Sequence, residues 1–334
     1  MKKHSLIIGI DISKLTLDIV GIDFDNQVVL KRSSIDNTKT RIGSFLKKTA
    51  TTYGKENILV VFENTGVYGY FLASVLHKLS IGFCNLSALE VYRSSGIKRG
   101  KSDAADALKI ARYGMTNYYK LELSSLIGKN LAKLKVLYTQ RDKIVATISS
   151  FGNNREMEAF LPKTVIAELA SSTKDIIKNL RKNLKKIEKQ ILEVIEADTS
   201  LKEKYRLAMS VPGVGPQTAT YILIVTKGFT TFDNARQLAC YAGVAPFPYQ
   251  SGTSIKGRNK VSHLADKKLK SLLNMCAMNA KKSDPQLRCY FNEKVEEGKN
   301  KMLVLNNIRN KVLHRVFAVV KRGTPYVNTY NFAT

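Results

Sequence analysis

The order of apolar runs in the first ninety residues limits the possible fold more than any other feature of the chain. Five short runs rich in β-branched and apolar residues predict strands at 6–11, 16–23, 27–34, 58–64 and 81–86. Only a few polar residues separate the first three, which predicts an antiparallel meander. The run at 58–64 has the apolar character of a buried central strand. Helical patterns lie around 42–49, 70–79 and 89–94.

Three strands followed by helix, strand, helix, strand and helix is the order of the RNase H-like α/β fold. We therefore predict such a domain over residues 1–122. The first and fourth strands of this fold are neighbours, so the residues that end the runs at 6–11 and 58–64 are expected at one edge of the sheet.

An acid ends each of these two runs, Asp11 in GIDISK and Glu63 in VVFEN. A buried strand that ends in an acid is unfavourable unless the acid has a partner or a metal. Downstream, KSDAADA places Asp103 and Asp106 three residues apart at the start of a predicted helix, on one face. Four carboxylates gathered in this way suit one or two Mg²⁺ ions, which can activate a nucleophile and stabilise the leaving oxygen of a phosphodiester.

Simpler interpretations of the same acids stay open. Asp103 could cap the helix and Asp106 could complement its dipole. Asp11 could begin a turn, and Glu63 could be an ordinary loop acid. These accounts must all hold at once, whereas a metal site explains the four positions through one requirement.

Residues 123–205 have a different character, because apolar residues recur at helical spacing, and those of the later run alternate steps of three and four over a lysine-rich opposite face. The apolar positions are Leu134, Leu137, Ile144, Ile148, Ile177, Leu180, Leu184, Ile187, Ile191 and Val194. Gly152 and Pro162 interrupt the pattern, which predicts a helical hairpin with a coiled-coil seam. The hairpin could be a spacer or dimerisation arm, or an amphipathic connector that packs on its own chain.

Residues 206–334 predict a compact, mainly helical C-terminal domain with Gly- and Pro-containing turns. VPGVGPQTA is similar to the turn of helix-hairpin-helix modules, in which Gly213 and Gly215 would present backbone N–H groups to a DNA phosphate. A plain turn between two helices is the alternative.

The charge of the chain predicts a polyanionic partner, because 54 Lys+Arg face 27 Asp+Glu, a net charge of +27. Lys98, Arg99 and Lys101 are candidate nucleic-acid contacts. The 44% hydrophobic content suffices for a core and argues against disorder.

The four cysteines form no CxxC pair, so neither a zinc site nor a disulfide framework is indicated. No signal peptide or membrane span is recognised, which predicts a soluble cytoplasmic protein.

The segment PFPYQSGTSIKGRNK offers hydroxyl groups beside several cations, in what we expect to be a loop shaped by its prolines. A serine that attacks a phosphodiester needs its charge stabilised, and Lys256, Arg258 and Lys260 could do this. Ser-Gly in a surface loop is more often an ordinary turn, and Tyr249 is a competing hydroxyl.

Taken together, GIDISK, FENTGVYG, KSDAADA, SVPGVGPQTA and YAGVAPFPYQSGTSIKGR resemble the insertion sequence 110 family of transposases, which includes the Piv-type DNA invertases. The likeness extends over nearly the whole chain. It implies a RuvC-like nuclease domain with a DEDD tetrad, a coiled-coil connector, and a C-terminal domain with a serine in an SG motif. By this resemblance the tetrad is Asp11, Glu63, Asp103 and Asp106, and the nucleophile is Ser251.

The resemblance implies a site-specific DNA recombinase whose tetrad binds Mg²⁺ or Mn²⁺ and whose serine forms a covalent phosphoserine link to DNA. The implied partners are donor and target DNA duplexes, a structured non-coding guide RNA encoded by the element, and further copies of the chain in a dimer or tetramer. A prokaryotic, nucleoid-associated location and no membrane partner are implied as well. RNA guidance would fit the positive charge and relieve the protein of sequence readout.

Three other functions remain open at this stage. A junction-resolving nuclease of the RuvC type would use the tetrad and water without a covalent intermediate. A sugar-kinase-like or actin-like ATPase also opens with a strand ending in GID, but later phosphate-binding loops are missing from the pattern. A non-catalytic nucleic-acid-binding protein would satisfy the charge but has no use for four aligned carboxylates.

Overall fold

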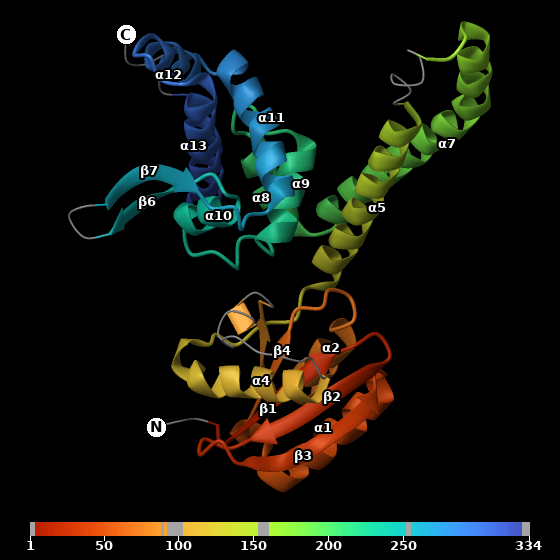
Figure 1. Ribbon diagram of the computed structural model, residues 1–334, viewed down its shortest axis with the longest axis vertical. Helices are drawn as coiled ribbons and strands as arrows, with labels where there is room; N and C mark the ends of the chain where they lie inside the picture. Colours follow the sequence, from red (N-terminus) through yellow and green to blue (C-terminus); the bar gives the residue numbers. More distant parts are fainter. Residues whose placement is uncertain (1–3, 88–89, 92–102, 153–159, 252–254, 329–334) are drawn as a thin grey trace. The chain divides into compact units, whose positions relative to one another are not determined.

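The computed structural model describes residues 4–87, 90–91, 103–152, 160–251 and 255–328 (Figure 1). The chain forms two compact units, Met1–Leu126 and Ile127–Thr334. Within the described residues, every helix is too short or too polar to cross a membrane.

A five-stranded mixed sheet forms the centre of the first unit, in the order β3-β2-β1-β4-β5 (Figure 1). The strands are β1 (Leu6–Ile12), β2 (Thr16–Ile22), β3 (Val28–Asp36), β4 (Ile58–Glu63) and β5 (Gly82–Leu86). The first three pair antiparallel, and β4 lies parallel to both β1 and β5. This order and polarity confirm the predicted RNase H-like sheet.

Helices cover both faces of this sheet, which explains why β1 and β4 are apolar on both faces. One face packs against α1 (Lys39–Tyr53) and α2 (Tyr70–Leu79), and the other against α4 (Asp103–Thr116). Short 3₁₀ helices occupy Lys55–Asn57 and Tyr118–Lys120. Of the helix expected at 89–94, Glu90 and Val91 are helical and the rest lies outside the described residues.

Helix α4 lies unusually close to β1 because Gly9 has no side chain. A Cβ at Gly9 would lie 2.2 Å from the Ala107 carbonyl oxygen and 2.4 Å from the Ala111 nitrogen. Near the other end of the helix, a Cβ at Gly114 would lie 2.8 Å from a Val61 methyl group. Since Gly114 also approaches Ile7, α4 runs antiparallel to β1 and its N-terminus points to the carboxyl end of that strand.

The second unit contains the predicted helical hairpin, formed by α5 (Lys129–Gly152) and α7 (Lys163–Glu196). Leu134, Tyr138, Ile191 and Val194 form an apolar cluster against which Tyr221 and Ile224 of α9 pack. At this end the seam is therefore covered by the hairpin's own chain.

The remaining helices of this unit are α8 (Thr199–Met209), α9 (Pro216–Val225), α10 (Ala235–Tyr241), α11 (Lys267–Ser283), α12 (Pro285–Glu296) and α13 (Lys301–Arg322). They surround one large apolar core, to which α13 contributes residues from Val304 to Val319. Asp198, Asn234, Asp266 and Asp284 cap α8, α10, α11 and α12 through their side chains, satisfying free N–H groups at the helix starts.

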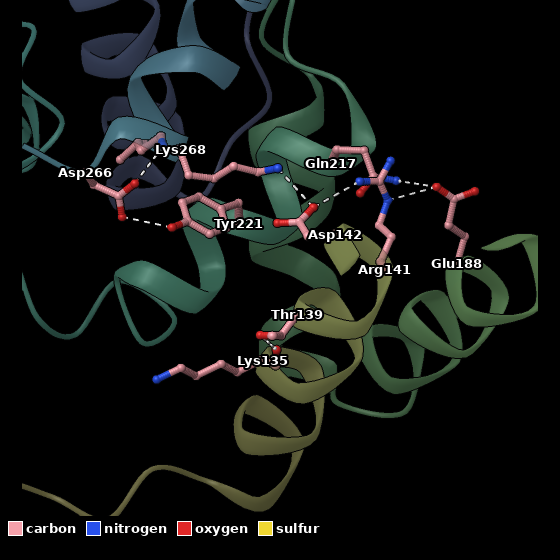
Figure 2. A network of polar contacts seen from close by, with 10 residues as sticks. Lys135, Thr139, Arg141, Asp142, Glu188, Gln217, Tyr221, Asp266 and Lys268 are labelled. Atoms are coloured by element: carbon pink, nitrogen blue, oxygen red, sulfur yellow. Dashed lines mark hydrogen bonds and ion pairs between the residues drawn. The ribbon is translucent and has the colours of Figure 1, made fainter. Parts of the chain in front are cut away.

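Polar contacts tie the hairpin to these helices (Figure 2). Arg141 of α5 donates from Nε to Glu188 of α7 at 2.9 Å, and Gln217 of α9 donates to the same carboxylate at 3.1 Å. The Lys268 ammonium of α11 lies 2.9 Å from Asp142 of α5. These contacts fix the direction in which the hairpin leaves the helices.

The serine segment is a β-ribbon and not the loop that its prolines suggest. Strand β6 (Pro246–Ser251) pairs antiparallel with β7 (Ile255–Val261). Pro246 is the first residue of its strand, and Pro248 lies at the register irregularity between Phe247 and Tyr249. At both positions a missing N–H is tolerated, so the prolines do not prevent the strand.

We predict that Gly9→Ala lowers the free energy of unfolding by about 1–3 kcal/mol, because the new methyl group would overlap the α4 backbone. Urea denaturation of the full chain, followed by circular dichroism, measures the change. The matched control is Gly43→Ala in α1, where the nearest atom to a Cβ is 4.0 Å away. This control is expected to be neutral or stabilising, since alanine favours a helix. Equal stability of the two variants would contradict the close packing.

Candidate active site at the carboxyl edge of the sheet

Asp11 and Glu63 lie side by side at the carboxyl ends of two parallel neighbouring strands. Ile10 of β1 is the register partner of Phe62 of β4, and the two acids are the next residues along each strand. Ile10 and Phe62 pack towards α1 and α2. Because side chains alternate along a strand, Asp11 and Glu63 share the face towards α4. Both acids are half-buried.

The N-terminal turns of α4 bring a third carboxylate to this edge. Asp106 is half-buried and directly precedes Ala107, whose carbonyl oxygen packs against Gly9. Asp103 is the first residue of α4, as the sequence predicts, and its side chain lies outside the described part of the structure.

Electrostatics show that these carboxylates share one environment. Burial raises the pKa of Glu63 above its ordinary value. The positive charge of Lys109 lowers this pKa, while the negative charges of Asp11 and Asp106 raise it further. The Lys109 ammonium lies 3.9 Å from the Asp106 carboxylate, one helical turn further along α4. Three acids and one lysine therefore interact at this edge.

Two features of this edge were missed by sequence reasoning. The one sequence feature that could have indicated Lys109 is its spacing of three residues from Asp106, which places both side chains on the same face of the helix. Asp18 of β2 is the direct register partner of Asp11 and is almost completely buried. Its charge is balanced by Arg32, whose Nη2 lies 3.2 Å from the Asp18 carboxylate. A pattern of apolar runs does not indicate such a pairing.

The donor chemistry of this edge fits a divalent cation, because Mg²⁺ and Mn²⁺ prefer carboxylate oxygens. Among the described side chains, which do not include that of Asp103, no group of three or more His, Cys, Asp or Glu residues is arranged to hold a metal ion. Asp11, Glu63 and Asp106 each bring a carboxylate to this edge, and the fourth predicted ligand, Asp103, has its side chain outside the described part.

Ser251 lies in the second unit, as the last residue of β6, and is the register partner of Ile255 on β7. Lys256 and Lys260 belong to β7 as partners of Gln250 and Phe247, and Lys260 is exposed. Arg258 lies between them on the same strand. The ribbon thus places the predicted serine and three cations on two paired strands; the side chains of Ser251, Lys256 and Arg258 are outside the described part.

The predicted helix-hairpin-helix turn connects α8 to α9. Gly213 has a φ of +87°, and a Cβ there would lie 2.4 Å from the Cys276 carbonyl oxygen of α11. Glycine is therefore required at position 213 by the backbone conformation and by the close packing against α11. Gly215 precedes Pro216 at the start of α9, and a Cβ there would meet no atom within 4 Å. Lys98, Arg99 and Lys101 lie outside the described residues.

Comparison with known proteins gives two matches to family models. A model for DEDD transposases of the IS110 type matches residues 8–166, and a model described as "Transposase IS116/IS110/IS902 family" matches residues 205–292. The first range contains the four predicted acids, and the second contains Ser251.

Relatives and a solved structure are similar over different lengths. The pilin gene-inverting protein of Moraxella lacunata is 27% identical over 322 residues, covering 96% of this chain and 97% of the relative. A 43.6 kDa protein of insertion element IS110 from Streptomyces coelicolor is 24% identical, covering 96% and 95%. A structure of T. thermophilus RuvC in complex with a Holliday junction substrate matches 36% of this chain and 100% of that chain, with 11% identity and a TM-score of 0.30.

The two family models include both the carboxylate edge and the β6–β7 ribbon, and the relatives match almost from end to end. The chain accordingly belongs to the IS116/IS110/IS902 family of transposases, enzymes that act on DNA.

Proposed function

We propose that this transposase cuts and exchanges DNA strands with Ser251 as the nucleophile and with Asp11, Glu63, Asp103 and Asp106 as ligands of Mg²⁺ or Mn²⁺. The observation that supports the tetrad most is the electrostatic coupling of Glu63 with Asp11 and Asp106 at the carboxyl edge of the sheet. Half-buried like charges are unfavourable by themselves, so a fold retains them where a cation or a reaction uses them.

The proposed reaction keeps the number of phosphodiester-type bonds constant. The Ser251 hydroxyl oxygen bonds to phosphorus, its proton is lost to a base, and the bond from phosphorus to one sugar oxygen breaks. The freed sugar oxygen takes up a proton. A sugar hydroxyl of another strand then attacks the phosphoserine, which restores the serine and joins the exchanged strand.

Each part of the chain has a separate task in this scheme. A divalent cation held by the four acids would supply Lewis-acid stabilisation of phosphate charge. Lys256, Arg258 and Lys260 neutralise charge beside Ser251 on the same ribbon. We propose that the backbone N–H groups of Gly213 and Gly215 position a DNA duplex by donating hydrogen bonds to its phosphates.

The proposed partners are two DNA duplexes, a structured RNA encoded by the element, and one or three further copies of the chain. A net charge of +27 supports the binding of a large phosphate surface. Base pairing by an RNA would supply the sequence specificity that backbone contacts lack. A relative named for gene inversion and another named as a transposase fit either inversion or transposition as the outcome.

We predict that Mg²⁺ or Mn²⁺ stabilises the chain against thermal unfolding and that Glu63→Gln removes most of this effect. A ligand at about 100 times its dissociation constant stabilises by about 2.7 kcal/mol. Differential scanning fluorimetry with increasing metal measures the shift without any activity assay. Glu56→Gln, an exposed acid of the same unit, is the control and should respond as the wild type does. An equal metal response in Glu63→Gln would contradict the assignment.

The raised pKa of Glu63 also predicts a pH dependence in the metal-free chain. The folded state binds this proton more tightly than the unfolded state, so the ionised form destabilises the fold. Free energy of unfolding should therefore fall as pH rises through and above the ordinary Glu pKa of about 4.3. Glu63→Gln should be more stable than the wild type at neutral pH with EDTA present, and the difference should shrink below about pH 4. If Glu63→Gln is instead less stable than the wild type at neutral pH, the negative charge of Glu63 is compensated in the folded chain.

We predict that Ser251→Ala abolishes covalent capture of DNA. The chain is incubated with Mg²⁺, its co-purifying nucleic acid and a labelled donor duplex, and protein–DNA adducts are separated under denaturing conditions. Removal of the attacking oxygen should reduce the adduct by at least about 10³-fold, as for other nucleophile deletions. Tyr249→Phe tests the competing hydroxyl on the same strand and should retain the adduct.

Two outcomes would change the mechanism. An adduct that persists in Ser251→Ala and disappears in Tyr249→Phe would assign the nucleophile to tyrosine. Cleavage without any adduct, lost in Asp11→Asn but kept in Ser251→Ala, would indicate a junction-resolving nuclease that uses water.

A further inference from the structure

A basic cleft lies between α12 and α13 in the second unit, apart from every residue assigned above. Its volume is about 290 Å³, close to the lower limit of small-ligand sites. Its lining consists of Gln286, Leu287, Tyr290, Lys311, His314 and Arg315. None of the acids on α12 is among these residues.

The three basic residues share one face of α13. Lys311, His314 and Arg315 follow the i, i+3, i+4 spacing that brings side chains together on a helix. The opposite face of α13, including Val312, Leu313 and Val316, belongs to the main core. The spacing is therefore not a product of core packing.

Arg315 is held in place by two side-chain partners at the start of α12. Its Nη1 lies 2.6 Å from the carboxylate of Asp284, which is completely buried. Its Nη2 donates to the Gln286 side-chain oxygen at 2.5 Å. Asp284 also caps α12 by accepting from the Leu287 N–H at 3.0 Å. The Asp284 carboxylate is thus occupied by Arg315 and by the helix start.

Lys311 leaves the cleft with an uncompensated positive charge, and the His314 imidazole lies on the same face of α13. Both are exposed, and in the part of the chain that the structure describes neither forms an ion pair within 4.0 Å. The Lys311 ammonium lies 4.6 Å from the centre of the Tyr290 ring, a cation–π contact that orients it without neutralising it. The first turn of α12 supplies Gln286 and Leu287 to the lining, and its N-terminus is already capped by Asp284.

We propose that this cleft binds a backbone phosphate of a nucleic acid. Lys311, His314 and the half-buried Arg315 offer positive charge and hydrogen-bond donors on one helix face, which suits the oxygens of one phosphodiester group. The site is independent of the tetrad and of Ser251, and it would hold the nucleic acid by its backbone without reading sequence. The phosphate could belong to DNA or to RNA, since both present the same group.

The test is fluorescence anisotropy with the full-length chain, a labelled duplex DNA of arbitrary sequence, and a labelled RNA hairpin of equal phosphate number. EDTA is present throughout, so no strand chemistry contributes and a failure here is distinct from a failure of the proposed reaction. Each dissociation constant is measured over a series of salt concentrations. Lys311→Gln combined with His314→Gln should raise it about fivefold and reduce its logarithmic salt slope by about 1.

Two control variants make the result decisive. Lys301→Gln removes the same charge from an exposed position of α13 outside the cleft and should change little. Lys311→Arg keeps the charge and should retain the wild-type affinity and slope. Weakened binding of DNA alone, RNA alone or both supports the site and identifies the source of the phosphate. If the double variant binds both nucleic acids as tightly as Lys301→Gln does, the proposal is overturned.

Discussion

The contact between the backbone of α4 and β1 at Gly9 determines where the candidate active site forms. Packed interiors leave no room for even one extra methyl group without displacement, and here the atom that would be displaced is a backbone carbonyl. Because α4 lies directly on the strand, the residue before Ala107 reaches the carboxyl edge of the sheet. Asp106 thereby comes close enough to Glu63 for their charges to interact. A larger residue at position 9 would move the helix outward and weaken this coupling.

The same edge shows how the fold tolerates several acids in a small volume. Asp18 of β2 is paired with Asp11 of the neighbouring strand β1, and Arg32 compensates the charge of Asp18. Lys109 partly compensates Asp106 and Glu63. The compensation is incomplete, since burial and the neighbouring acids still raise the pKa of Glu63. Incomplete compensation of this kind lowers stability, and the cation that we propose at this edge would complete it.

The second unit uses charge in two different ways. Ion pairs join α5 to α7 and α11, and a hydrogen bond from the neutral Gln217 joins α9 to α7, so these contacts fix the helices in place (Figure 2). Along α13, by contrast, Arg315 is paired inside while Lys311 and His314 remain exposed beside it. The first arrangement stabilises the fold. The second leaves positive charge available to a phosphate, in a chain whose net charge already favours nucleic acid.

The amino-acid sequence alone determined the strand order, the helical hairpin, and the pair Asp11 and Glu63. Apolar runs and helical spacing are local properties, and an acid at the end of a buried run stands out because burial makes it costly. The sequence did not reveal the role of Gly9, the lysine at 109 or the β6–β7 ribbon. A glycine in a strand, a lysine on a helix and prolines beside a serine have ordinary local explanations. Their actual roles depend on which segment packs against them, and only the tertiary structure decides that.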